Sequence, residues 1–387
     1  SPSRSRPPAP PAAVGLRPSR RPAFGAGHAA VAGGFPAFGA RASGPRLRAV
    51  PVATGLENPW SIAFLPDGRM LASERPGRLR IVGRDGRMAE VAGVPPVWAM
   101  GQGGLLDICL HPRFATNDTI YLSYAAPVAG GATIRIARAR LAPGPSLADL
   151  QPILDAGPPV ANGFHFGCRL AFAPDGMLLA TTGDRLVAQS RAGDPADLRG
   201  QTIRLRDDGG IPGDNPFVGR AGARPEIFTM GHRNPQGLAI HPRSGEPWSH
   251  EHGPRGGDEV NLLRPGADHG WPRTTHGVDY SGATISPHRS LPGIADPLWV
   301  WTPSIAPSGM AFCTSPRYPG WQGSLFVGAL AGQALVRLEL AGDRVLREER
   351  LLRQEGHRIR DVRQGPDGWL YLAVDAMDAA ILRLELA

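Results

Sequence analysis

The sequence predicts an all-β fold, a six-bladed β-propeller, on the strength of three observations. The chain contains 51 Gly and 41 Pro among 387 residues, a density that suits short strands joined by turns better than long helices. An apolar segment, a Pro-containing turn and a second apolar segment recur six times along the chain. No helical segments alternate with these strands, which disfavours a parallel α/β fold.

The repeated unit indicates a β-hairpin. Pro fixes φ in the turn, and the flanking Ile, Leu, Phe, Val and Tyr suit paired strands. The six turns lie at Pro66, Pro112, Pro174, Pro242, Pro316 and Pro366. Their separations of 46 to 74 residues fit a four-stranded blade with loops of variable length. A pair of β-sandwiches is the alternative, and the recurrence of one turn type without a linker disfavours it.

The chain changes character at about residue 46. Residues 1–46 are rich in Pro, Ala, Arg and Gly and have no hydrophobic period. We therefore expect a disordered leader over residues 1–46 and a propeller domain over residues 47–387.

The basic residues exclude several functions. All 42 are Arg, so a Schiff-base lysine and a phosphate-loop lysine are excluded. Residues 1–48 hold 8 of these Arg, and the rest of the chain has 34 Arg against 34 acidic residues. The net charge of +8 thus belongs to residues 1–48, and no nucleic-acid partner is expected.

Cysteine spacing and short motifs exclude further classes. Cys109, Cys168 and Cys313 form no CxxC pair, which excludes a zinc cage and a disulfide framework and leaves one bridge with a free thiol open. No apolar stretch reaches the roughly 18–20 residues of a transmembrane segment. GxSxG, HExxH and GxGxxG are absent, so serine hydrolase, zincin and nicotinamide-dependent functions have little support.

Polar segments between the hairpins carry candidate site residues. Loops at one end of a propeller converge on its central channel, so distant segments can share one site. The guanidinium groups of Arg233, Arg358 and Arg360 suit planar carboxylates, while His165 is a candidate base and Asp184 its acidic partner. Structural alternatives stay open: a strand-end hydrogen bond for the histidine, and a salt bridge within the RIRD segment (residues 358–361) for its arginines.

Nine motifs then carry a resemblance to a known family. They are NPWSIAFLPDG, GQGGLLDICLHPRF, HFGCRLAF followed by TGD, LRGQTIRLRDDGGIPGDNPF, GHRNPQG, EHGPRGGDEVNLL, HGWP, SGMAF and RIRDVRQGPDG. Over residues 47–386 the chain resembles the soluble quinoprotein aldose sugar dehydrogenases, members of the glucose/sorbosone dehydrogenase family. The resemblance implies a six-bladed propeller that oxidises aldoses at C1 to lactones, with pyrroloquinoline quinone (PQQ) as hydride acceptor and Ca²⁺ as Lewis acid.

The resemblance also implies roles for individual residues. His165 matches the general base, Asp184 the acid that supports it, and Arg233 a third catalytic residue. The positions that match the quinone site are Gln102, Arg233, Asn234, Thr275, Tyr280, Arg358 and Arg360. The carbonyls of Gly253 and Pro254 match ligands of the calcium at the quinone, and Glu259 with the carbonyl of His269 resembles a structural calcium site. Ala331 departs from the pattern, since family members often have there a Lys that contacts the quinone.

Partners and compartment follow from the same resemblance. It implies an aldose substrate, an unidentified electron acceptor, a monomer or weak dimer, and a periplasmic or secreted location. Two other functions stay open. A calcium-dependent propeller lactonase would bind its metal through acidic side chains and would not need the arginines. A non-catalytic propeller that binds glycan or protein would keep the fold without turnover, and Ala331 leaves this possibility open.

Overall fold

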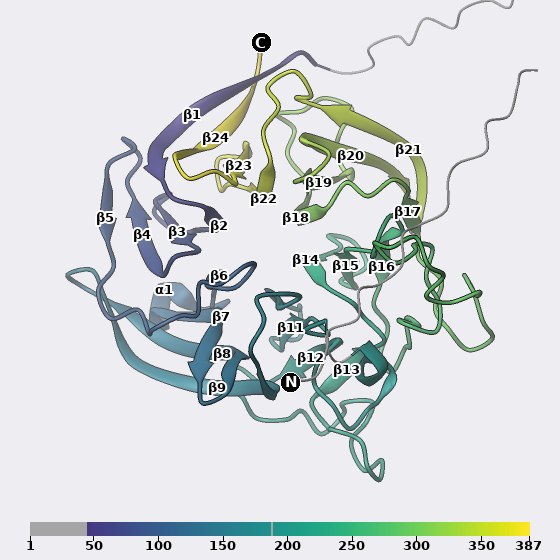
Figure 1. Cartoon of the computed structure of the whole chain (residues 1–387). Helices are drawn as coiled ribbons and strands as arrows, with labels where there is room; N and C mark the ends of the chain where they lie inside the picture. Colours follow the sequence, from purple (N-terminus) through teal and green to yellow (C-terminus); the bar gives the residue numbers. More distant parts are fainter. Residues whose placement is uncertain (1–44, 187–188) are drawn as a thin grey trace, which may run out of the picture. The chain divides into compact units, whose positions relative to one another are not determined.

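The computed structural model describes residues 45–186 and 189–387, and these form a ring of β-sheets (Figure 1). Six antiparallel sheets of four strands each make the ring, so the predicted six-bladed propeller is confirmed. The predicted leader, residues 1–46, lies almost entirely outside the described residues. Within the described residues, no helix has the length and apolarity needed to cross a membrane.

The blades follow the chain in order. Blade 1 consists of β2 (Pro59–Phe64), β3 (Met70–Glu74), β4 (Arg78–Val82) and β5 (Met88–Glu90). Blade 2 consists of β6 (Leu105–Leu110), β7 (Thr119–Val128), β8 (Gly131–Ala142) and β9 (Ser146–Val160). Blade 3 consists of β10 (Gly167–Phe172), β11 (Leu178–Thr182), β12 (Gln201–Leu205) and β13 (Ile227–Met230).

The second half of the ring repeats the arrangement. Blade 4 consists of β14 (Pro235–Ile240), β15 (Pro247–Glu251), β16 (Asp258–Leu262) and β17 (Trp299–Trp301). Blade 5 consists of β18 (Pro307–Phe312), β19 (Leu325–Ala329), β20 (Ala334–Ala341) and β21 (Arg344–Leu351). Blade 6 consists of β22 (Ile359–Gln364), β23 (Leu370–Val374), β24 (Ala379–Leu386) and β1 (Leu47–Leu56).

The predicted hairpins are the first two strands of each blade. Pro66, for example, lies between β2 and β3, and Pro366 lies between β22 and β23. The turn at Pro112 is longer, since it contains the single-turn helix α1 (Phe114–Asn117). A 3₁₀ turn, Gln189–Gly193, follows β11.

The two ends of the chain close the ring. β1 pairs antiparallel with β24, and Leu47 lies opposite Leu386. The last blade therefore combines the first described strand with the last three strands of the chain, and this pairing closes the ring.

Apolar clusters fill the six junctions between neighbouring blades. The junction of blades 2 and 3 buries large side chains such as Tyr121 and Phe166. The junction of blades 3 and 4 has the smallest cluster, with Leu179, Phe228 and Leu238 among its few buried members. All three cysteines are free thiols, so the single disulfide left open by the sequence is ruled out.

A β-bulge interrupts the pairing near the start of the inner strand in every blade. A bulge inserts an unpaired residue and re-aims its side chain. The positions inside these bulges include Trp60, Asp107, Arg169, Gln236, Gly309 and Arg360. The repeated bulge thus places side chains from five of the six blades around the axis, since the position in blade 5 is Gly309, which has no side chain.

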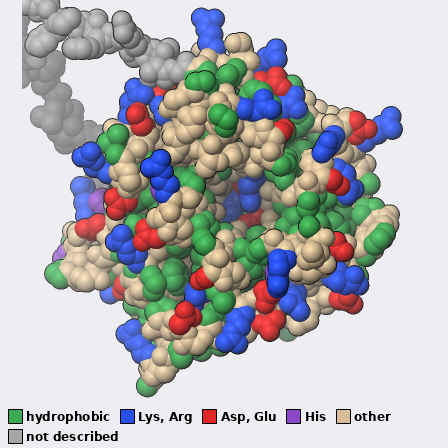
Figure 2. All heavy atoms as spheres, turned by 180° about the vertical axis from the view of Figure 1, so that it is seen from behind, with side chains coloured by type: hydrophobic (Ala, Val, Ile, Leu, Met, Phe, Trp, Pro, Cys, Tyr) green, Lys and Arg blue, Asp and Glu red, His purple; other side chains and the backbone are tan. Residues whose placement is uncertain are grey.

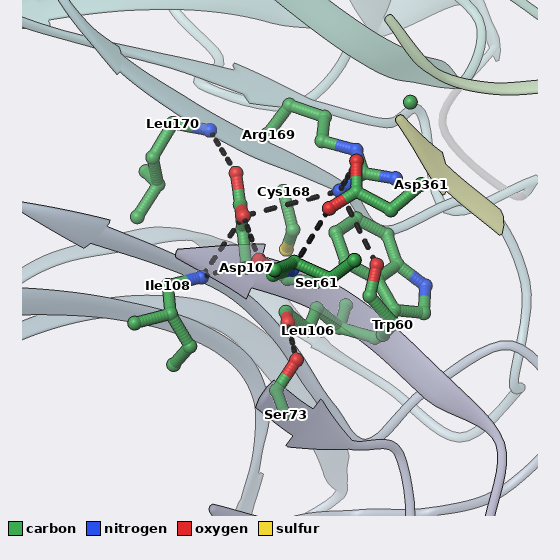
Figure 3. A network of polar contacts seen from close by, with 12 residues as sticks. Trp60, Ser61, Ser73, Leu106, Asp107, Ile108, Cys168, Arg169, Leu170 and Asp361 are labelled. Carbon is green, nitrogen blue, oxygen red and sulfur yellow. Dashed lines mark hydrogen bonds and ion pairs between the residues drawn. The ribbon is translucent and has the colours of Figure 1, made fainter. Parts of the chain in front are cut away.

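Arg169 contacts several residues of the other inner strands, and Figure 3 shows it with Trp60, Asp107 and Asp361. Its side chain is 2% exposed and forms ion pairs with Asp361 at 3.3 Å and with Asp107 at 3.9 Å. Its guanidinium lies 3.8 Å from the ring centroid of Trp60. It also donates to Ser308 Oγ of blade 5 and to the carbonyls of Gln236 and Arg360. One buried cation therefore contacts all five other blades, and the two carboxylates offset the cost of its burial.

The face opposite to that of Figure 1 is hollowed at its centre, where basic side chains lie (Figure 2). Arg363 is a basic residue of the axis with a side chain that is 25% exposed. It forms ion pairs of 2.9 Å with both Asp107 and Asp361. The axial carboxylates are therefore shared between two arginines.

Candidate active site

The predicted site residues lie at one end of the propeller. His165 precedes β10 and Asp184 follows β11, while Arg233 and Asn234 precede β14. Because β10 and β11 are antiparallel, the start of one lies beside the end of the other. Residues that precede inner strands and residues that follow second strands therefore meet at the same end of the ring.

His165 and Asp184 form a buried pair. The imidazole Nδ1 lies 2.6 Å from Asp184 Oδ1, and the two side chains are 6% and 0% exposed. The carboxylate is itself held, since Oδ1 accepts the Leu186 N–H at 2.8 Å and Oδ2 accepts the Trp271 Nε1–H at 2.8 Å. The imidazole Nε2 has no hydrogen bond to a described residue, so it is free to meet a ligand.

The pair is set for proton acceptance. Burial lowers the pKa of His165 below its usual value, and the positive charge of Arg233 acts in the same direction, while the hydrogen bond that Nδ1 donates to Asp184 opposes them. A histidine with a lowered pKa is neutral at pH 7, as a general base must be. His165 also has a φ of 52°, in the left-handed region that non-glycine residues rarely adopt.

Gln102 and Asn234 extend this pair into a network. Gln102 Oε1 accepts the backbone N–H of His165 at 3.1 Å and lies 3.5 Å from Asn234 Nδ2. Asn234 Oδ1 accepts the Gly167 N–H and one Gln236 Nε2–H, each at 3.2 Å. These polar contacts join blades 2, 3 and 4. Blades 3 and 4 also share the smallest apolar cluster.

The predicted arginines border the same network. Arg360 donates to Gln236 Oε1 at 3.1 Å and to Asp375 Oδ2 at 3.2 Å. Arg358 forms an ion pair of 3.6 Å with the same carboxylate. Neither pairs with Asp361, whose partners are Arg169 and Arg363. The structural alternative, a salt bridge between Asp361 and an arginine of the RIRD segment, is therefore wrong.

The arginines also present unused donors. Among the buried polar atoms of residues 45–186 and 189–387 that have no hydrogen-bond partner are the Nε atoms of Arg75, Arg233 and Arg360. Buried N–H donors are normally paired, because an unpaired donor costs about 1–3 kcal/mol. Three unpaired guanidinium donors at one end of the propeller fit an anionic ligand with several carboxylates.

A cavity of about 10 Å³ lies beside Arg233. Its volume suits one small ion or one water. The lining residues include Arg233, Glu251, Gly253, Glu259, His269, Trp271 and Thr275. Arg233 Nη1 donates to the Gly253 carbonyl at 2.7 Å, so this carbonyl oxygen already faces a cation.

The charges around the cavity also fit a cation. Burial raises the pKa of Glu251 and of Glu259, and the neighbouring Glu251 carboxylate adds to the shift of Glu259. Both ring nitrogens of His269 and Oδ1 of Asn261 lack hydrogen-bond partners. The described residues contain no metal-binding group of three or more His, Cys, Asp or Glu. Ca²⁺ also binds backbone carbonyl oxygens, and the carbonyls predicted as ligands at Gly253 and Pro254 are of this kind.

Pro254, Tyr280 and Ala331 belong neither to the cavity lining nor to the hydrogen-bond network around His165. Pro254 packs against Gly277, where a Cβ would lie 2.8 Å from the proline ring. Tyr280 is 69% exposed and its hydroxyl has no hydrogen bond to a described residue. Ala331 is exposed just after β19, and its methyl group supplies no charge in place of the family lysine.

Several residues of the site carried no role in the sequence analysis. Trp271, which holds Asp184, lies in the HGWP motif, so the motif marked it without revealing its contact. Glu251 lies nineteen residues after His232, its partner at 2.9 Å. Gln236 lies in the GHRNPQG motif, which marked it as a polar candidate without a defined role. Asp375 and Arg75 had no local signal, and Asp375 accepts a hydrogen bond from Asn58, 317 residues away.

Comparisons with known proteins agree with this geometry. The family model "Glucose / Sorbosone dehydrogenase" matches residues 56–383. The aldose sugar dehydrogenase YliI of Escherichia coli K12 is 43% identical over 337 residues, which are 85% of this chain and 90% of that protein. An uncharacterized protein of Synechocystis, slr1608, is 43% identical over 369 residues, which are 89% of this chain and 88% of that protein.

Solved structures show the same relationship. A crystal structure of the apo-form of soluble aldose sugar dehydrogenase from Escherichia coli has a TM-score of 0.85 and 40% identity, and covers 88% of this chain and 100% of its own. A PQQ-bound aldose sugar dehydrogenase from Streptomyces coelicolor has a TM-score of 0.73 and 31% identity, and covers 88% of this chain and 98% of its own. The chain therefore belongs to the glucose/sorbosone dehydrogenase family.

Proposed function

We propose that the protein is a quinoprotein aldose sugar dehydrogenase that oxidises aldoses at C1 to lactones with PQQ and Ca²⁺. The observation that carries the proposal is the meeting, at one end of the propeller, of the His165–Asp184 pair with the guanidinium groups of Arg233 and Arg360, each of which has a buried, unpaired Nε donor. The named relative from Escherichia coli is an aldose sugar dehydrogenase, and the PQQ-bound relative from Streptomyces coelicolor supports the same cofactor.

Each residue of the pair has a defined task. Oxidation of a cyclic aldose to its lactone removes a proton from O1 and a hydride from C1. His165 accepts the O1 proton at Nε2, the ring nitrogen that has no partner among the residues that the structure describes. Asp184 holds Nδ1 at 2.6 Å and stabilises the imidazolium that forms. Trp271 fixes the second carboxylate oxygen, so the pair keeps its geometry during proton transfer.

The arginines and carbonyls would hold the cofactor. Arg233, Arg358 and Arg360, with Gln102 and Asn234, would bind its carboxylates and ring oxygens, and Thr275 and Tyr280 are further predicted contacts. Gly253 and Pro254 would bind the calcium at the quinone, and Glu259 and His269 a structural calcium. When bound, PQQ supplies the two-electron acceptor and Ca²⁺ the Lewis acid that polarises it.

The alternatives differ in what they require. A lactonase has no use for an anionic cofactor, and therefore none for the unpaired donors of Arg233 and Arg360. A non-catalytic propeller has no use for a buried base whose Nε2 is unpartnered. The electron acceptor, the oligomeric state and the periplasmic or secreted location implied by the resemblance stay predictions.

Reconstitution tests the proposal. Purified apoprotein is incubated with PQQ and Ca²⁺, and dye reduction is followed with several aldoses. We expect turnover only when both are present and no turnover with nicotinamide cofactors. Full activity after dialysis against a chelator, or lactone hydrolysis without PQQ, would overturn the proposal.

Arg233→Ala sharpens this experiment. Because Arg233 donates to the Gly253 carbonyl and has an unpaired Nε, its loss should weaken PQQ binding, measured by absorbance titration, as well as turnover. Arg243, an exposed arginine of the β14–β15 turn at the far end of the same blade, is the control, and Arg243→Ala should bind PQQ like the parent.

A further inference from the structure

Arg75 is the first residue after β3 in blade 1. Its backbone N–H donates to the Asn58 carbonyl at 3.0 Å, and its carbonyl accepts the Leu105 N–H at 3.0 Å. Residues that follow second strands lie at the site end of the propeller, as Asp184 does in blade 3. The backbone of Arg75 is thus fixed between blades 1 and 2 at that end.

The side chain of Arg75 fastens the segment that carries Gln102. Its Nη1 donates to the carbonyl of Gly101 and, at 3.3 Å, to that of Gly103. These carbonyls flank Gln102 on both sides. The next residue, Gly104, has a φ of +135°, and a Cβ there would lie 2.0 Å from the Arg75 carbonyl oxygen. Only glycine lets the chain pass this close.

Gln102 connects the segment that Arg75 holds, residues 101–103, to the predicted base His165. Its side chain is exposed, yet its Oε1 accepts the N–H of His165 at 3.1 Å and its own N–H donates to the Gly163 carbonyl at 2.7 Å. The path from Arg75 to His165 therefore contains one intermediate residue. Loss of the Arg75 side chain would remove two of the hydrogen bonds that hold residues 101–103.

We propose that Arg75 is a positioning residue of the active site, which holds residues 101–103 so that Gln102 keeps His165 and Asn234 in place. The effect on turnover rests on the proposed function. The effect on the His165 backbone is a property of the ligand-free chain and is measurable without any cofactor.

The kinetic test compares two arginines of blade 1. Arg84 makes the same kind of contact, from Nη2 to the Asp67 carbonyl, at the β2–β3 turn. Arg75→Ala should lower kcat roughly 10- to 10²-fold, as expected for a small displacement of a catalytic group, and Arg75→Lys should restore part of the loss. Arg84→Ala should have the kcat of the parent. Equal kcat values for Arg75→Ala and the parent, or equal losses in both alanine variants, would overturn the proposal.

Amide hydrogen exchange in the apoprotein gives the independent measurement. The His165 N–H, which donates to Gln102, should exchange faster in Arg75→Ala and in Gln102→Ala, and at the parental rate in Arg84→Ala. The double variant should exchange no faster than Gln102→Ala, because both substitutions disrupt the same hydrogen bond between Gln102 and the His165 N–H. Parental exchange of His165 in Arg75→Ala, or additive effects in the double variant, would refute the positioning role. A parent that binds no PQQ would refute the proposed function and leave this measurement intact.

Discussion

Two histidine–carboxylate pairs occupy corresponding places in neighbouring blades. In blade 3, His165 Nδ1 lies 2.6 Å from Asp184, nineteen residues later. In blade 4, His232 Nδ1 lies 2.9 Å from Glu251, also nineteen residues later. Each histidine precedes the inner strand, and each carboxylate lies at the end of the second strand or just after it.

The two pairs differ at the other ring nitrogen. His232 Nε2 lies 2.8 Å from Thr229 Oγ1, and the ring stacks on His269 with centroids 4.7 Å apart. His165 Nε2 has no partner among the described residues. Burial lowers the pKa of both imidazoles, that of His232 to about 3. The comparison teaches that the carboxylate alone does not define a base, since a base also needs a ring nitrogen left open to a ligand.

The largest expected effect is that of His165→Ala. Loss of the open nitrogen should lower turnover roughly 10²- to 10⁴-fold, while PQQ binding, followed by absorbance titration, stays near that of the parent. A variant that oxidises aldose at the parental rate would contradict the mechanism. A variant that fails to fold would indicate a structural histidine instead.

Asp184→Asn should have the next largest effect. The amide keeps the approximate shape but loses the charge that stabilises the imidazolium, so turnover should fall roughly 10- to 10³-fold, less than for His165→Ala. The double variant should turn over no more slowly than His165→Ala, because the two residues act as one unit. Multiplied losses would show that Asp184 acts independently of the histidine.

His232→Ala should affect stability instead of turnover. The change leaves the Thr229 hydroxyl and one Glu251 oxygen without their buried partner, which should lower the free energy of unfolding by about 1–3 kcal/mol. Denaturant titration measures this loss, and turnover of the folded fraction should change less than threefold. A drop in turnover as large as that of His165→Ala, without loss of stability, would erase the distinction between the pairs.

The smallest expected effect is a shift of the pH profile. Because the pKa of His165 is lowered, kcat/KM of the parent should stay constant down to pH values below the usual histidine pKa of about 6.5 and then fall as the imidazole is protonated. Asp184→Asn removes the hydrogen bond and charge that raise this pKa, so the falling limb should move to lower pH. A limb that moves to higher pH would contradict the assigned roles.

The fold was predictable from local patterns and the site only in part. Six Pro-containing hairpins gave the number of blades, because each hairpin is a local structure. Closure of the ring by β1 and β24 joins residues such as Leu47 and Leu386, and no local pattern marks such a distant pairing. The inner-strand bulges that aim Gln236 and Arg360 also leave no periodic signal.

The interval between histidine and carboxylate shows most clearly what the sequence alone could not predict about the site. A spacing of nineteen residues fits both pairs, so spacing alone could not select His165. Family motifs selected it, and the structure adds the physical difference at Nε2. Asp375 and Arg75 reach the site through contacts between segments far apart in the chain, which the sequence could not reveal.

The central arginine of the propeller has a kinetic consequence. With Arg169 only 2% exposed between Asp107 and Asp361, paired side chains fill the centre of the axis, and the predicted base lies at one end of it. For a sugar dehydrogenase of the kind proposed, the aldose and the electron acceptor would therefore both approach from that end, in turn. Double-reciprocal plots at several acceptor concentrations should then give parallel lines, the signature of a ping-pong order.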